Sequence, residues 1–71
     1  MNIYEELAHA IILQAVKDYR KALRQLKRNP DYKKADIMKQ DCERFFQSEW
    51  FEYLTKLDGP WLMRKLREEA A

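Results

Sequence analysis

The pair of residues whose spacing most suggests chemistry is Glu6 and His9. Three positions apart on a helix, they place a carboxylate and an imidazole on one face, as di-iron carboxylate bundles do. Such a site needs two copies of the pair and two more carboxylates, whereas this chain has one histidine. Glu5 is also spaced for a simple contact with His9 one turn later. We therefore expect solvated helix residues here and no metal site.

Cys42 is the only cysteine and the only strong nucleophile candidate. Its helical phase matches Met38 and Phe45, so we expect it to point toward the core. A buried thiol among apolar groups has a raised pKa and is inert. Neither Ser48 nor Thr55 has a recognisable base partner, and no glycine-rich loop is present to hold phosphate. The sequence therefore predicts no catalytic residue, no cofactor and no enzyme activity, and a lone thiol fits a reducing compartment.

Basic residues recur every three or four positions along the first predicted helix. Between Lys17 and Lys39 the chain has nine basic and three acidic residues, a net charge of +6, whereas the whole chain carries +2 and the remainder therefore −4. We name the first six of these basic residues the basic ridge: Lys17, Arg20, Lys21, Arg24, Lys27 and Arg28.

The basic ridge could follow phosphates, dock on an acidic protein surface, or be an ordinary solvated helix face. The sequence has no cluster of Asn, Gln or Ser that could form hydrogen bonds with base edges. Aromatic residues, on which single-stranded bases could stack, are not interleaved with the basic ones. Nucleic-acid binding, mostly non-specific, is therefore the alternative prediction, and binding of a protein partner comes first.

Six of the nine aromatic residues fall between Phe45 and Trp61. Two pairs are adjacent, Phe45 with Phe46 and Trp50 with Phe51, and neighbours on a helix point about 100° apart. Either this region is covered on two sides, or one aromatic ring of each pair is exposed. Exposed rings anchor protein interfaces. The candidate anchors for a protein partner are Trp50, Phe51 and Trp61.

Two prolines mark the limits of the helices that carry these residues. The pattern predicts a helix over residues 3–28 with Asn2 as its N-cap. The Asn29-Pro30 step ends it, because the residue before a proline avoids helical dihedrals. Pro30 should then open a second helix that runs to about Phe46, with Asn29 as its cap.

The remaining breaks are less distinct. We interpret Gln47-Ser48 as a tight joint with Ser48 as an N-cap, although one continuous helix over residues 30–57 is an alternative. Asp58-Gly59-Pro60 marks the next break, where Gly59 should close a helix in the left-handed conformation and Pro60 should start the last one. The residues expected to face inward there are Trp61, Leu62 and Leu66, with Met63 as a further candidate.

Composition supports an all-α fold of one domain over residues 1–71. The chain has one Gly and two Pro, too few turn residues for a β protein, and is rich in helix formers. We expect a long helical hairpin plus two short C-terminal helices, in a small orthogonal or antiparallel bundle. The two hairpin helices are too long to be fully covered by two short helices, so the uncovered part could pair with a second copy in a homodimer. The longest uncharged run, residues 7–16, is too short to span a membrane, so we expect a cytoplasmic protein.

The residues from Glu43 to Gly59, together with Val16-Lys17-Asp18-Tyr19-Arg20, resemble short uncharacterised helical proteins of prophages and integrative elements in Gram-positive bacteria. The similarity covers most of the chain. It implies an accessory role in a phage or mobile element, and it assigns no functional residue.

Overall fold

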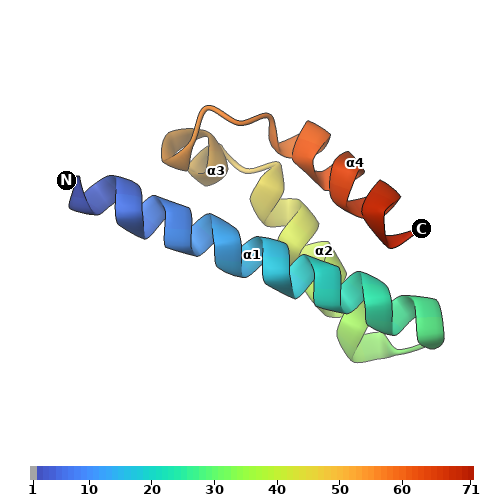
Figure 1. Ribbon diagram of the computed structural model, residues 1–71. Coiled ribbons are helices and arrows are strands. Elements are labelled where there is room, and N and C mark those ends of the chain that lie inside the picture. Colours follow the sequence, from blue (N-terminus) through green and yellow to red (C-terminus); the bar gives the residue numbers. More distant parts are fainter. Residues whose placement is uncertain (1) are drawn as a thin grey trace.

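The computed structural model describes residues 2–71, which form four α-helices and no strand (Figure 1). The helices are α1 (Ile3–Arg28), α2 (Lys33–Phe46), α3 (Glu49–Leu54) and α4 (Gly59–Ala70). The α1 and α2 helices form an antiparallel hairpin, and α4 lies beside the C-terminal half of α1 (Figure 1). The predicted all-α fold, a long hairpin followed by two short helices, is therefore confirmed. The described chain is elongated, with extents of 42 × 19 × 19 Å.

The bounds of α1 are those predicted from its capping residues. The Asn2 side chain accepts a hydrogen bond of 3.0 Å from the Tyr4 backbone N–H, which satisfies one of the free donors at the helix start. Acidic residues occupy the first turn and basic residues the last, as the helix dipole favours. Asn29 is extended and ends the helix.

The start of α2 differs from the prediction. Pro30 does not open the helix, which begins three residues later, at Lys33. Residues 29–32 form a turn in which the Tyr32 N–H donates to the Asn29 carbonyl at 3.1 Å, and the Asn29 side chain accepts from the Asp31 N–H at 3.3 Å. Proline is favoured at the second position of such a turn because its φ is preset there. Asn29 and Pro30 therefore build the hairpin turn instead of a helix start.

The predicted joint at Ser48 is confirmed, and residues 30–57 are not one continuous helix. The Ser48 hydroxyl oxygen accepts from the Phe51 N–H at 3.1 Å, which caps α3. The same hydroxyl donates to the Phe45 carbonyl at 2.7 Å, which satisfies an acceptor in the last turn of α2. One side chain thus closes one helix and starts the next.

Gly59 does not close α3 as predicted. It is the first residue of α4, is buried, and does not have a positive φ. The Asp58 side chain caps α4 by accepting from the Trp61 N–H at 3.1 Å. A Cβ at position 59 would collide with the Phe46 carbonyl oxygen. The glycine is needed because the start of α4 lies directly against the end of α2.

An aromatic cluster forms the centre of the core. The Phe46 ring, 1% exposed, packs edge-to-face on Tyr19 and Phe51, with centroid distances of 5.6 and 5.7 Å. The adjacent aromatic pairs each bury one ring, because Phe46 and Phe51 are buried whereas Phe45 is half-buried and Trp50 exposed. The buried hydrophobic residues are Tyr19, Ala22, Ala35, Cys42, Phe46, Phe51, Met63 and Leu66.

The inward face of α4 was predicted only in part. Met63 and Leu66 are buried and Leu62 is half-buried, but Trp61 is 45% exposed. At about 100° per residue, Trp61 lies about 140° around the helix from Leu66. A helix that buries Met63 and Leu66 therefore turns the Trp61 ring toward solvent, where the Lys65 Nζ lies 5.9 Å from its centroid.

Candidate interaction surfaces

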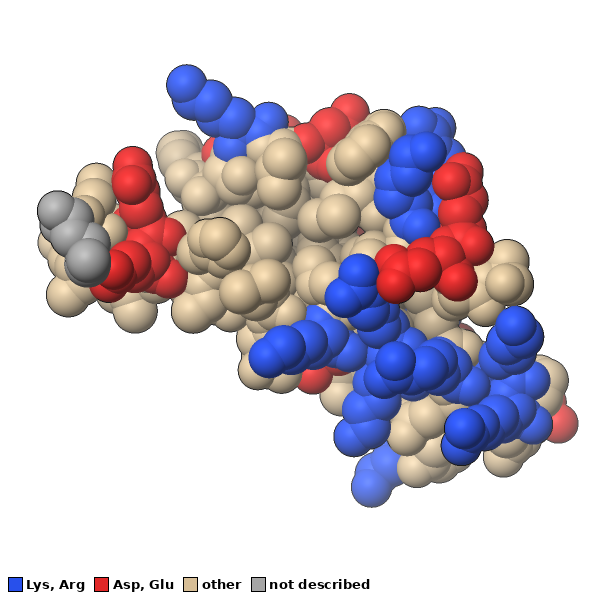
Figure 2. Space-filling model, viewed as in Figure 1, with Lys and Arg blue, Asp and Glu red and all other residues tan. Residues whose placement is uncertain are grey.

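The basic ridge lies on α1, and all six of its side chains are exposed. Figure 2 shows Lys and Arg gathered over the C-terminal half of α1 and the hairpin turn. Two of the six turn toward α4: Arg20 forms an ion pair of 3.1 Å with Glu69, and the Lys27 Nζ donates to the Ala70 carbonyl at 3.4 Å. These two residues contact the end of α4.

The other four members of the ridge form an outward stripe. Spacings of four, three and four residues place them on one side of α1, opposite the buried Tyr19. Within residues 2–71 none of them forms an ion pair. We name them the free stripe: Lys17, Lys21, Arg24 and Arg28.

The opposite end of α1 is acidic. Glu5 and Glu6 occupy its first turn, and acidic side chains are visible at this end of the molecule in Figure 2. The molecule therefore has a positive end at the hairpin turn, as the charge distribution in the sequence predicts, and acidic residues at the start of α1.

Only two of the three candidate aromatic anchors are accessible. Phe51 is 1% exposed, because its ring packs edge-to-face between Phe45 and Phe46, so it belongs to the core and not to a binding surface. Trp50 is 55% exposed and Trp61 45%. The sequence could not decide which ring of the Trp50-Phe51 pair faces inward, because both are large and apolar.

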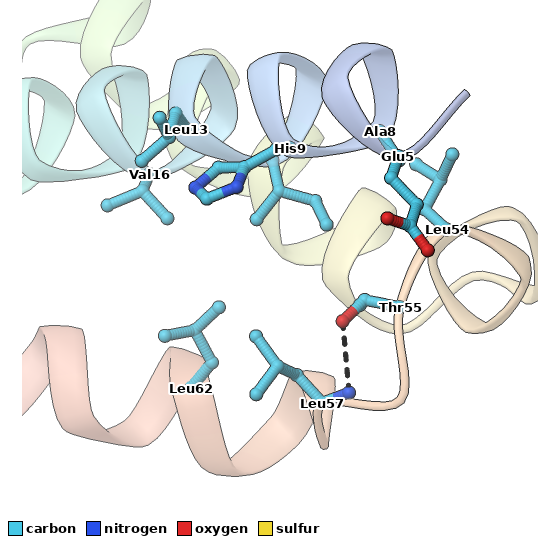
Figure 3. A pocket seen from close by; sticks show the side chains of 10 residues that line it. Glu5, Ala8, His9, Leu13, Val16, Leu54, Thr55, Leu57 and Leu62 are labelled. Atoms are coloured by element: carbon cyan, nitrogen blue, oxygen red, sulfur yellow. Dashed lines mark hydrogen bonds between the residues drawn. The ribbon is translucent and has the colours of Figure 1, made fainter. Parts of the chain in front are cut away.

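A first groove lies between the N-terminal half of α1 and the segment that joins α3 to α4 (Figure 3). In Figure 3 the His9 and Val16 side chains project from α1 toward Leu57 and Leu62 across the groove. The Leu57 N–H donates to the Thr55 hydroxyl at 3.2 Å, which fixes this wall. The groove has a volume of about 420 Å³ and is lined by Glu5, Ala8, His9, Ile12, Leu13, Val16, Leu54, Thr55, Leu57 and Leu62.

A second groove lies on the other side of α1, between α1 and α2. Its volume is about 400 Å³. The Trp50 ring forms one wall and packs edge-to-face on Phe45, with a centroid distance of 5.3 Å. The groove is lined by Ile11, Gln14, Ala15, Asp18, Met38, Asp41, Cys42, Phe45 and Trp50. Neither groove was predicted from the sequence, although the hairpin helices were expected to be incompletely covered.

The thiol of Cys42 has the buried environment that was predicted. Cys42 is 6% exposed, and burial raises the pKa of its thiol to about 11. The carboxylates of Asp18, Asp41 and Glu43 are smaller contributions to the same rise, because they disfavour a thiolate. The thiol is therefore protonated at neutral pH and poorly nucleophilic.

Comparison with known proteins identifies no relative: the chain matches no protein-family model, no curated protein and no solved structure. Within residues 2–71, His, Cys, Asp and Glu side chains form no group of three or more that could hold a metal ion. In the same residues, no helix combines the length and apolar character needed to cross a membrane. The free stripe and the two grooves are therefore the candidate interaction surfaces of the described residues.

Proposed function

We propose that this protein is a small helical interaction protein without catalytic activity, an accessory factor of a phage or mobile genetic element that acts in the cytoplasm. The role in a mobile element is supported by the sequence resemblance. The interaction role is supported by the first groove, which leaves large apolar side chains uncovered. Leu13 is 47% exposed and Leu57 52%. Full burial of an exposed leucine side chain contributes about 1.5–3 kcal/mol, so covering the exposed half of each of these two side chains favours binding of a partner here.

The occupant that fits the first groove is an amphipathic helix of a partner protein whose apolar face is flanked by basic residues. Apolar grooves between helices take such helices through side chains spaced three and four positions apart. Glu5 lines the groove, and Asp58 follows Leu57, which also lines it. These carboxylates would pair with the basic flanks, and Trp61 remains a candidate anchor at this end of α4.

A designed peptide tests this proposal directly. We expect a helical peptide with a leucine face and lysine flanks to bind, and to shift the NMR signals of His9, Leu13, Leu57 and Leu62. Leu13→Glu should weaken binding at least about tenfold, because it places a charge in the apolar groove. Leu7→Glu is the matched control, since Leu7 is also exposed on α1 but does not line this groove. Absence of binding, or shifts confined to other surfaces, would refute the proposal.

Nucleic-acid binding is a second candidate, favoured by the absence of ion pairs on the free stripe within residues 2–71. Four cations on one helix side can follow a phosphate backbone, and such binding weakens steeply with salt because counterions are released. Labelled duplex and single-stranded DNA titrated at two salt concentrations test it. Arg24→Glu should weaken binding, whereas Arg64→Glu on the exposed side of α4 should not. No binding even at low salt excludes this candidate.

A further inference from the structure

The face of α1 that borders the second groove carries exposed apolar side chains. Tyr4 is 79% exposed and Leu7 56%, and Ile11 is half-buried at the edge of the groove. Positions 4, 7, 11, 14 and 18 alternate spacings of three and four residues, the pattern of a seam between two paired helices. The last two positions are polar, and Gln14 donates a hydrogen bond of 3.0 Å to Asp18.

We propose that a second copy of this chain covers this face, with the two α1 helices antiparallel about a two-fold axis at Ile11. Within this arrangement, residues whose numbers add to about 22 lie at the same level. Leu7 of one copy then faces Ala15 of the other, and Tyr4 faces Asp18, whose carboxylate accepts from the tyrosine hydroxyl. The surface is self-complementary, as a two-fold interface requires. Along α1, the exposed side chains of Tyr4 and Leu7 come before Ile11, and the second groove begins at Ile11 and continues after it.

The charges on the flank of this seam favour the antiparallel arrangement. Glu6 and Lys17 are eleven residues apart, so they lie within about 20° of each other around α1. A two-fold antiparallel pair brings the same flank of both helices together, and Glu6 of one copy then lies level with Lys17 of the other. Both side chains are exposed and neither forms an ion pair within residues 2–71. A parallel pair would instead bring Glu6 against Glu6.

The proposed pair uses the opposite side of α1 from the first groove, so it is independent of the proposed function. It would cover Tyr4, Leu7 and the outer face of Trp50, which are among the largest exposed apolar groups of the described chain. It also places the acidic start of each α1 beside the basic middle of the other. Opposite charges on the two copies of α1 thus lie side by side in the dimer.

Sedimentation equilibrium tests the pairing. The wild-type chain of 8.7 kDa should sediment with twice this mass as its concentration rises. Leu7→Glu should weaken dimerisation at least about tenfold, because it places a charge in the seam. Leu13→Glu is the matched control, because Leu13 has similar exposure but faces the first groove. Circular dichroism verifies that both variants are folded, and a wild-type chain that remains monomeric at millimolar concentration overturns the proposal.

Charge reversal tests the orientation of the two helices. Glu6→Lys and Lys17→Glu should each weaken the dimer by about three- to tenfold at low salt, since two contacts per dimer become repulsive. An equimolar mixture of the two variants should restore the wild-type affinity, because both contacts in the mixed dimer are again between opposite charges. A mixture that dimerises no better than the separate variants overturns the antiparallel arrangement. The peptide titration separates the two proposals. The Leu13→Glu variant should bind the peptide weakly but dimerise like the wild type. The Leu7→Glu variant should bind the peptide like the wild type but dimerise weakly.

Discussion

The Tyr19 hydroxyl donates a hydrogen bond of 2.7 Å to the Glu43 carboxylate, which joins α1 to α2 in the middle of the hairpin. The same carboxylate lies 3.8 Å from the Arg67 guanidinium, so it also connects the hairpin to α4. Burial raises the pKa of Tyr19 well above its usual value, and the hydrogen bond to Glu43 raises it further. One tyrosine and one carboxylate therefore link three helices at the edge of the aromatic cluster.

Tyr19→Phe should lower the free energy of unfolding by about 1–2 kcal/mol. It keeps the ring that packs on Phe46 but removes the hydrogen bond to a charged acceptor. Urea unfolding followed by circular dichroism measures the change. Tyr53→Phe is the matched control, because Tyr53 is 87% exposed, and it should leave stability within about 0.5 kcal/mol of wild type. Equal stability of the two variants would show that the Tyr19–Glu43 bond makes no net contribution.

Gly59→Ala should be among the most damaging single substitutions in this chain. The added Cβ meets the Phe46 carbonyl oxygen, which belongs to the backbone of α2, so α4 as a whole must move. Overpacking of this kind costs about 1–3 kcal/mol, and we expect a loss at the upper end of this range. Thermal unfolding measures it. Arg64→Ala, on the exposed face of the same helix, should have little effect, and a Gly59→Ala variant as stable as wild type would contradict the close contact.

Ser48→Ala should cost about 1–2 kcal/mol, which is at the upper end of what an N-cap contributes. The variant loses both hydrogen bonds of the hydroxyl, so the Phe51 N–H loses its partner, whereas the Phe45 carbonyl still accepts from the Ser48 backbone N–H at 3.1 Å. Asn2→Ala removes only an exposed cap at the chain start and should cost less. Amide hydrogen exchange at Phe51 should accelerate in the Ser48 variant alone. An unchanged exchange rate at Phe51 would argue against the role of Ser48 as the N-cap of α3.

The Cys42 thiol should make stability depend on pH in the alkaline range. Its pKa is raised from 9.0 to about 11 in the folded chain, so folding favours the protonated thiol. This contribution to stability is complete below pH 9 and is lost as the pH rises through about 11. Tyr19, whose pKa is also raised, acts in the same direction. The melting temperature should therefore fall over this range, less steeply in Cys42→Ala, and an identical slope in both proteins would contradict the assignment.

Reactivity of the same thiol provides a separate prediction. At pH 8 a thiol-specific dye should label the native protein at least about tenfold more slowly than the urea-unfolded chain, because Cys42 is buried and protonated. The rate of dye absorbance change in the two states measures this ratio. Equal rates would mean that Cys42 is open to solvent in the native state.

Local signals in the sequence were sufficient where the deciding contacts are local. Asn2 and Ser48 cap helices through residues two and three positions away, so both helix starts could be predicted. Gly59 was misinterpreted because its deciding contact is with Phe46, thirteen residues earlier, and no nearby residue shows this. Pro30 was misplaced for a different reason, since Asn-Pro suits both a helix start and a turn.

For the candidate surfaces too, only the features that depend on local residue spacing could be predicted. The position of the basic ridge followed from residue spacing alone. Its division into Arg20 and Lys27 on one side and the free stripe on the other depends on the end of α4, more than forty residues away along the chain. The grooves depend on how far α3 and α4 extend over α1, which is a property of packing and has no local sequence signal.

The charge imbalance between the two ends of α1 has a practical consequence for experiments on surfaces. Residues 17–39 carry +6 and the remainder −4, and the positive side chains gather at the hairpin turn. Adsorbed on mica or a sulfonate-coated sensor chip, this protein would stand upright on its hairpin turn, with the start of α1 pointing into the buffer. Immobilisation of this kind would present both grooves to a partner in solution without a tag or a covalent linker.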